Sequence, residues 1–342
     1  MDSNEIARAP GVRDVARVAG VSRQTVSRVL HDHPSIRDET RMRVLAAMEE
    51  LRFRPNRAAR MLTTARSTTI GILASSASSL FGPASSIDAV ENAARAAGYF
   101  VTTVHVADTS AAELGAALDH LAAQAVEGIV VVAPERPVLD ALAARSPGVP
   151  FVTLHGSQEP GADGVFVDQV AGARLAVRHL LELGHRRIAH LEGPVDWAEA
   201  AARRRGFEAE LAAWEVRGTV SRPGDWTSAS GYEVGRELLA GPPVTAVFSS
   251  NDQMALGLLH ALREAGRSVP AEVSVVGFDD IPEAAYFAPP LTTIRQDFAE
   301  LGRRCVAHLL AAIEGGLAEV TPPVEPVLVV RESTGPVPVD PA

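Results

Sequence analysis

The stretch "VAGVSRQTVSRVL", residues 18–30, decides the fold of the amino-terminal part of the chain. Before Gly20, apolar residues recur every three or four positions, at Val12, Val15, Ala16 and Ala19. After it, Ser22 is a suitable N-cap, because its hydroxyl can accept a hydrogen bond from the next helical turn. The stretch therefore predicts two short helices joined by a tight glycine turn.

The second of these helices has two chemically different faces. At about 100° per residue, Val26, Val29 and Leu30 share one face. The opposite face carries Arg23, Gln24, Ser27 and Arg28. A third helix is expected to turn Val44, Leu45, Met48 and Leu51 inward. Three such helices form a helix-turn-helix unit, in which Arg suits guanine, Gln suits adenine and Ser suits a phosphate. An ordinary helical bundle with a polar outer face is the alternative.

Charge is distributed unevenly along the chain, whose formal net charge is -10. Residues 1–66 hold 13 Arg against 8 acidic residues, so the acidic excess lies in the remainder. All 32 basic residues are Arg. A basic head on an acidic body indicates that only the head approaches nucleic acid.

Length and composition indicate a globular protein of more than one domain. The chain has 342 residues, of which 46% are hydrophobic and 22% charged. Its single cysteine, Cys305, cannot form an internal disulfide and is expected to be buried. We find no apolar run of about 18 residues and no secretory signal pattern, and therefore expect a cytoplasmic protein without membrane contact.

From residue 69 onward, short β-rich runs alternate with helical patterns. The runs are "TTIGIL", "FVTTVHV", "EGIVVVA", "VPFVTL", "HRRIAHLEG", "VTAVFSS" and "EVSVVGF". Helices are expected at 86–97, 169–183, 199–213 and 252–265, among others. This alternation predicts an α/β body with two doubly wound parallel-sheet lobes and a ligand in the cleft at the strands' carboxyl ends. Polar residues follow several strands there, and Asp252 and Asp280 among them could equally cap helices.

Two long motifs carry a family resemblance. "VRDVARVAGVSRQTVSRVL" and the later "RPNRAARML" resemble the head and hinge of the LacI/GalR-type (lactose-repressor) transcription regulators. The resemblance implies that Arg23 and Gln24 read bases, while Ser27 and Arg28 contact bases or phosphates. It also implies hinge contacts with DNA from Asn56, Arg57, Ala59 and Leu62, with Leu62 as a wedge in the minor groove. A flexible tether is the alternative for this segment.

The resemblance also implies a domain order. It gives a disordered tail at 1–10, an all-α head at 11–54, a hinge at 55–68 and an effector-binding, dimerising body at 69–342. The body resembles periplasmic binding proteins, with one lobe at 69–166 and 296–325 and the other at 167–295 and 326–335. Arg37 stands where the family often has a capping Ser, so the third helix is expected to begin less firmly.

The body motifs "GDW", "NDQMALG", "VVGFDD" and "PPLTTIRQDFAELG" resemble the family's effector domain closely. On the first-lobe side the resemblance implies effector contacts from Leu80, Gly82 and Pro83. Elsewhere it implies contacts from His155, Asp168, Arg203, Trp226, Asn251, Asp279 and Gln296. His155 stands where galactoside-binding members have Asp, and Asp168 either contacts ligand or braces the lobe crossover.

These features predict a homodimeric repressor, not an enzyme, that a galactoside-like or glucoside-like sugar releases from a palindromic operator. No catalytic motif, cofactor site or metal site is expected. The Pro-rich end "RESTGPVPVDPA" lacks heptads and favours a dimer over a tetramer. The alternatives are a purine-type corepressor regulator of the same fold, a sugar-binding transport component and an enzyme of sugar metabolism.

Overall fold

The computed structural model describes residues 10–30, 33–54, 61, 66–74, 81–106, 110–132, 148–154, 164–316 and 322–337. The chain divides into two compact units, Met1–Ser67 and Thr68–Ala342, here called the head and the body. Several predictions lie outside the described residues. They concern the tail at 1–9, most of the hinge, and the site residues Asn56, Arg57, Ala59, Leu62, Leu80 and His155.

The head contains the helices α1 (Val12–Ala19), α2 (Arg23–Leu30) and α3 (Asp38–Glu50). Gly20 ends α1 in the left-handed conformation at φ 65°, which a glycine adopts without steric strain. Ser22 Oγ accepts a hydrogen bond from the Thr25 amide at 3.0 Å, so it caps α2 as predicted. The core joins all three helices through Val15, Ala16, Ala19, Val26, Val29, Val44 and Ala47. The predicted pair of short helices with a tight turn is confirmed.

One inward prediction for α3 is wrong. Leu45 is 50% exposed, whereas Val44 is fully buried and Met48 and Leu51 are partly buried against the core. At about 100° per residue, Ala47, Met48 and Leu51 lie within about 60° of Val44 around the helix, whereas Leu45 lies about 100° from it and outside this buried stripe. Arg37 precedes α3 without a side-chain cap, as the missing Ser implied.

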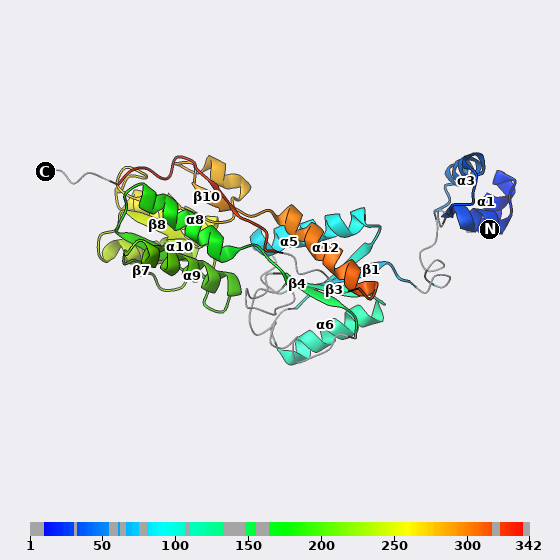
Figure 1. The fold of residues 1–342 in the computed structure, drawn as a ribbon, viewed down its shortest axis with the longest axis horizontal. Coiled ribbons are helices and arrows are strands. Elements are labelled where there is room, and N and C mark those ends of the chain that lie inside the picture. Colours follow the sequence, from blue (N-terminus) through cyan, green and yellow to red (C-terminus); the bar gives the residue numbers. More distant parts are fainter. Residues whose placement is uncertain are drawn as a thin grey trace, which may run out of the picture. The chain divides into compact units, whose positions relative to one another are not determined.

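The first sheet of the body is parallel, with strand order β2-β1-β3-β4-β5. Its strands are β1 (Thr69–Ala74), β2 (Phe100–His105), β3 (Gly128–Val132), β4 (Phe151–Leu154) and β5 (Gly164–Val165). One face carries α5 (Phe81–Ala96) beside α12 (Phe298–Ile313), while α6 (Ala111–Ala123) lies apart from this pair, as Figure 1 shows. Helix α5 begins five residues before the predicted start at residue 86.

The second sheet is also parallel and has the order β7-β6-β8-β9. Its strands are β6 (Ile188–Leu191), β7 (Thr219–Val220), β8 (Ala246–Ser249) and β9 (Ser274–Val276). Its helices are α8 (Gln169–Glu182), α9 (Ala198–Ala213), α10 (Ser228–Ala240) and α11 (Asp252–Glu264). All seven predicted β-rich runs contain a strand, and the two-residue strands β5 and β7 lie outside them. The two-lobed parallel fold is confirmed.

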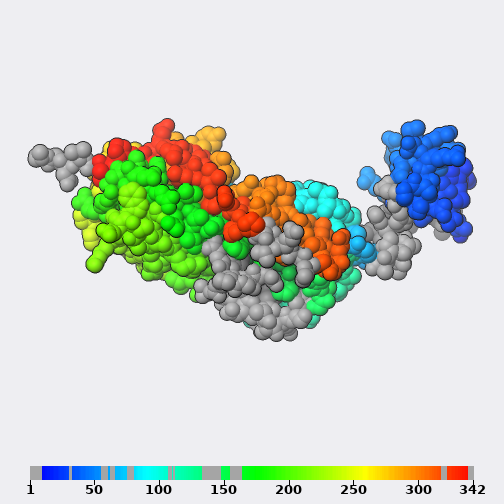
Figure 2. Space-filling view, viewed as in Figure 1, coloured from blue at the N-terminus to red at the C-terminus, as the bar shows by residue number. Residues whose placement is uncertain are grey.

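The chain passes between the two sheets more than once. Val167 forms a parallel bridge with Val324, and α12 buries Leu301 and Leu309 in the core of the first sheet. Strand β10 (Thr293–Arg295) pairs antiparallel with β11 (Val327–Val329) beside the second sheet. In Figure 2 the orange and red carboxyl-terminal segments accordingly lie against both parts of the body.

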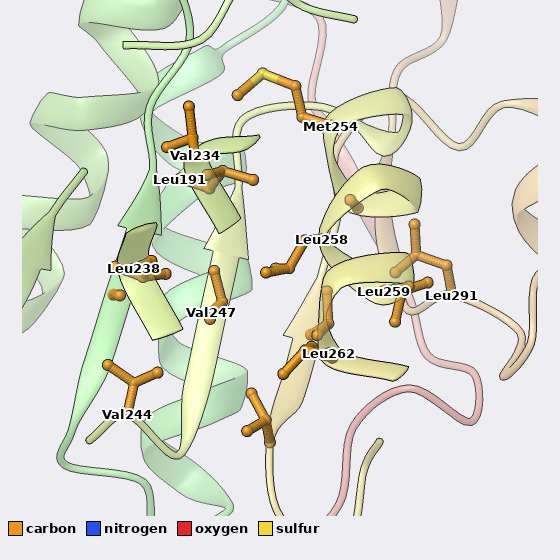
Figure 3. Packing of buried hydrophobic residues seen from close by; sticks show 14 of the residues in the cluster. Leu191, Val234, Leu238, Val244, Val247, Met254, Leu258, Leu259, Leu262 and Leu291 are labelled. Atoms are coloured by element: carbon orange, nitrogen blue, oxygen red, sulfur yellow. The ribbon is translucent and has the colours of Figure 1, made fainter. Parts of the chain in front are cut away.

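The largest cluster of buried residues lies in the second lobe. Its side chains come from β6, β8, α10 and α11, and Figure 3 shows Val247, Leu258 and Leu262 facing one another there. Cys305 is fully buried in the first lobe, as predicted, and burial raises the pKa of its thiol. Within the described residues, no helix combines the length and apolarity that crossing a membrane requires.

Helices α10 and α11 approach so closely that Gly257 has no room for a side chain. A methyl group there would overlap the backbone of Ser228 and Tyr232 on α10. Because backbone cannot move aside like a side chain, we expect Gly257→Ala to destabilise the body by about 2–3 kcal/mol. Gly235→Ala is the matched control, because its closest contact would be the flexible end of Leu258 at 3.0 Å and its nearest backbone atom would be at an ordinary 3.4 Å. Equal melting temperatures for the two variants would contradict this account.

Candidate effector pocket and DNA-binding surface

The head presents the predicted polar face to solvent. Arg23, Gln24, Ser27 and Arg28 are all exposed on α2, while Val26 and Val29 anchor the helix in the core. The structure therefore leaves these side chains positioned to approach the major groove of DNA. The hinge residues named for the same partner lie outside the described residues.

A pocket in the body brings together seven of the predicted effector residues. About 390 Å³ of space between its atoms is unoccupied, and part of that space is open to solvent. The residues lining it include Gly82, Pro83, Arg203, Trp226, Asn251, Asp279 and Gln296. Gly82 and Pro83 come from the first turn of α5, and the others from the second lobe and the segment after β10. The pocket thus lies between the lobes, at strand ends.

Arg203 is the buried cation of this pocket. Only 4% of it is exposed, and burial lowers the pKa of its guanidinium while the charge of Asp279 raises it. Its Nε donates to Gln169 Oε1 at 2.9 Å, and its Nη1 donates to the Ser250 carbonyl oxygen. Its guanidinium carbon also lies 3.9 Å from the centre of the Phe278 ring. One rotamer is therefore held from several sides.

Asp279 and Gln296 form a polar wall of the pocket next to Arg203. Gln296 Nε2 donates to Asp279 Oδ1 at 2.7 Å, and Arg203 Nη2 lies 3.4 Å from the same oxygen. Asp279 has a φ of 109°, and its neighbour Asp280 has 53°, a backbone region that residues with a side chain rarely adopt. Such strained residues persist where surrounding contacts hold them, as Arg295 and Arg331 hold Asp280 at 2.6 Å each.

Trp226 and Trp197 form an aromatic corner of the pocket. Their rings meet edge to face, with centroids 5.3 Å apart. Trp226 is 5% exposed and fits over Gly193, where any side chain would collide with the indole. Among the described residues, its Nε1–H has no hydrogen-bond partner. An indole offers both an apolar face and one unused donor to a ligand with ring and hydroxyl groups.

Asn251 connects this corner to α11. Its Oδ1 accepts from the Met254 amide at 2.8 Å as the helix N-cap, and its Nδ2 donates to the Trp226 carbonyl oxygen at 3.0 Å. Asn251 therefore holds Trp226 in its unusual backbone conformation, with a φ of 72°. Asn251 thus lines the pocket and also stabilises the start of α11 and the loop that carries Trp226.

Three acidic residues lie elsewhere. Asp168 does not line the pocket but caps α8, accepting from the Ala171 amide at 2.8 Å. Asp252 is fully buried and accepts from Thr293 Oγ1 at 2.6 Å and the Ile281 amide at 2.9 Å. Burial, and then the charge of Asp279, raise the pKa of Asp252 well above its ordinary value. Asp252 and Asp280 thus brace the strand ends behind the pocket.

Sequence reasoning missed three lining residues, namely Phe81, Trp197 and Glu199. A signal existed for Trp197, because the pair Asp196-Trp197 repeats the flagged Asp225-Trp226. Phe81 directly precedes the flagged Gly82 and packs its ring edge to face on Phe298 at 5.9 Å. Within the described part of the chain, no group of three or more His, Cys, Asp or Glu side chains is arranged to hold a metal ion.

Comparisons with known proteins agree with this architecture. Residues 5–56 match bacterial regulatory proteins of the lacI family, and residues 177–334 match the periplasmic binding protein-like domain. The lactose operon repressor of Escherichia coli K12 is 37% identical over 304 residues, covering 88% of this chain and 84% of the relative. This chain belongs to the lacI family. It is a DNA-binding transcriptional regulator, and its relatives are regulators, not enzymes.

Solved structures of the family superpose on most of the chain. A lac repressor dimer bound to operator and the anti-inducer ONPF has a TM-score of 0.82 and 35% identity, covering 96% of this chain and all of that one. The regulator CelR in complex with cellobiose has a TM-score of 0.67 and 33% identity, covering 95% of this chain and 99% of that one. The lacI-type fold of head and two-lobed body is thereby confirmed.

Behind the pocket of this lacI-family chain, His190 is a buried pH-sensitive group. Its ring stacks on Phe207 and Phe248, with centroids 5.1 and 4.8 Å away, and its Nδ1 donates to the Phe248 carbonyl oxygen at 3.1 Å. Nε2 lies 3.4 Å from Oγ of Ser250, whose carbonyl oxygen accepts from Arg203. Burial lowers the pKa of His190 from 6.5 to about 4.

The lowered pKa of His190 predicts acid sensitivity of the body. In the unfolded chain the His190 side chain is protonated below pH 6.5, whereas in the folded protein it stays neutral down to about pH 4. The free energy of unfolding should therefore fall through this window by about 3 kcal/mol from this group. In His190→Leu that part of the pH dependence should vanish, as urea unfolding between pH 7 and pH 4 would reveal. The exposed His260→Leu is the control, and a His190→Leu variant with an unchanged acid slope would refute the assignment.

Proposed function

We propose that this regulator is a repressor that a galactoside-like or glucoside-like sugar releases from a palindromic operator. The observation that carries the sugar is the buried Trp226, whose indole N–H has no partner within the described residues and which lines the pocket together with Asp279, Gln296 and Asn251. Aromatic faces pack on the apolar faces of sugar rings, and such polar groups match neighbouring hydroxyls. Complexes of relatives with cellobiose and with ONPG support this ligand class.

The DNA-binding part of the proposal rests on the head. We assign base reading to Arg23 and Gln24, and base or phosphate contacts to Ser27 and Arg28, all exposed on α2. One three-helix head has too little surface for specific affinity, so two heads in a homodimer would read the two half-sites. The dimeric relative on its operator supports this arrangement. Such a regulator works in the cytoplasm, where its DNA is.

The hinge connects the two activities. One or two turns of helix are marginally stable in water, so residues 55–62 would order on DNA, with Asn56, Arg57 and Ala59 near the backbone and Leu62 in the minor groove. A sugar that holds the two lobes in one arrangement would disfavour the ordered hinge. Differential affinity of several kcal/mol between the two arrangements is enough to shift most of the population.

The sugar assignment is tested at Trp226. We expect Trp226→Ala to lower the affinity for the active member of a panel containing lactose, cellobiose and ONPG at least tenfold, because the aromatic face and its N–H are both lost. Operator affinity without sugar should stay unchanged in a gel shift. Calorimetry measures the first quantity, with Trp214→Ala, a 38% exposed tryptophan at the carboxyl-terminal end of α9, as control. If only purines bind and they tighten operator binding, a corepressor replaces the sugar-released repressor.

The wedge is tested at Leu62. Leu62→Ala should weaken binding to a palindromic operator by tenfold or more while leaving sugar affinity unchanged, because only the groove contact is lost. Met61→Ala, the preceding hinge residue, provides the matched control. Equal gel-shift affinities for wild type and Leu62→Ala would leave the hinge as a tether without a wedge.

A further inference from the structure

Four buried side chains form a closed hydrogen-bonded ring at the back of the pocket. Arg203 Nε donates to Gln169 Oε1 at 2.9 Å, and Gln169 Nε2 donates to Gln296 Oε1 at 2.8 Å. Gln296 Nε2 donates to Asp279 Oδ1 at 2.7 Å, and Arg203 Nη2, 3.4 Å from that oxygen, closes the ring. Three members line the pocket, and Gln169 does not.

Gln169 is the member that gives the ring its direction. It is 4% exposed, and each end of its amide has one partner. Its oxygen accepts from the guanidinium, so its nitrogen must face Gln296 and the Gln296 nitrogen must in turn face Asp279. A carboxylate at position 169 would accept from Arg203 but could not donate. Gln296 would then turn its carbonyl oxygen towards the Asp279 carboxylate, which is repulsive.

Gln169 and Gln296 also belong to the two segments that pass between the lobes. Gln169 opens α8 directly after Asp168, whose amide donates to the Val324 carbonyl oxygen at 2.9 Å. Gln296 lies between β10, beside the second sheet, and α12, which packs on the first. The bond between the two amides therefore joins both crossover segments at the pocket.

We propose that Gln169 is a positioning residue for effector binding. Its two hydrogen bonds hold the Arg203 guanidinium and the Gln296 amide in the orientation required for ligand binding. They also connect both groups to the segments that pass between the lobes. This inference rests on the proposed function, because the ligand it serves is the sugar proposed above. Preorganised donors raise affinity because fewer side chains have to be ordered when the ligand binds.

The first test replaces Gln169 by Met, which keeps the length of the side chain and removes both hydrogen bonds. We expect the affinity for cellobiose or ONPG, whichever the wild type binds, to fall about tenfold in calorimetry. Gln124→Met is the matched control, because Gln124 is exposed at the end of α6. Unchanged affinity in Gln169→Met would overturn the proposal.

A double variant separates positioning from general destabilisation. Because Gln169 acts on both Gln296 and Arg203, adding Gln169→Met to Gln296→Met should lower sugar affinity clearly less than the tenfold loss of Gln169→Met alone, and the remaining loss is the part that depends on Arg203. Contacting residues in one network are non-additive in this way, while independent losses multiply. A full tenfold further loss in the double variant would show that Gln169 does not act through Gln296, and would overturn the proposal.

A third measurement needs no ligand and tells the two failures apart. Hydrogen exchange in peptides spanning 166–172 and 294–298 should be faster in ligand-free Gln169→Met than in wild type and Gln124→Met, because the bond between the crossovers is gone. If no sugar binds the wild type but hydrogen exchange is faster in Gln169→Met, the sugar assignment is wrong, while the role of the Gln169–Gln296 hydrogen bond in joining the two crossover segments is supported. Unchanged exchange would overturn the proposal whatever the sugars do.

Discussion

The body is organised around one constraint, which is that the charge of Arg203 is buried and has to be neutralised where it lies. An unpaired buried guanidinium would be strongly destabilising, so its partners are fixed in place with it. Those partners come from α8, the loop after β8 and the loop after β9, and α9 carries the arginine itself. Contacts with the Arg203 guanidinium therefore position each of these segments at the pocket.

In a pocket built in this way, the polar side chains are held in place by contacts within the protein. Trp226, Asp279 and Asp280 have positive φ values, and all three lie in or beside it. Each is held by named contacts: Trp226 by Asn251, Asp279 by Gln296 and Arg203, and Asp280 by two arginines. Because the fold maintains this strain, ordering the site takes little free energy from ligand binding. The second lobe is therefore the preorganised part of the pocket, and the first lobe supplies Gly82 and Pro83.

How much of this could be predicted depends on whether a residue's role is local. The α2 face and the seven β-rich runs follow from periodicity, and the family motifs brought seven effector residues to one pocket. Trp197 was missed because the loop after β6 carries no periodicity, and Glu199 because it lies in the first turn of α9, where the helical pattern does not mark pocket residues. For Asp168 the motif left ligand contact and a brace of the lobe crossover open, because a motif does not distinguish a cap from a contact. The prediction for Leu45 was wrong because this residue lies about 100° around α3 from Val44, outside the stripe that faces the core. The tie between Gln169 and Gln296 joins positions 127 residues apart, and no local pattern encodes it.

The difference between the second lobe, which holds most of the pocket's polar groups in place, and the first lobe, which supplies Gly82 and Pro83, limits how an effector can act. A ligand shifts an equilibrium only by the difference in its affinity for the two arrangements. A ligand that contacted the second lobe alone would meet the same Arg203, Asp279 and Trp226 in both, and would shift nothing. Under the proposed function, signalling therefore requires a molecule that spans the pocket from this wall to Gly82 and Pro83 at the start of α5. Size and reach, more than the strength of any single hydrogen bond, decide which members of a chemical class can change DNA affinity.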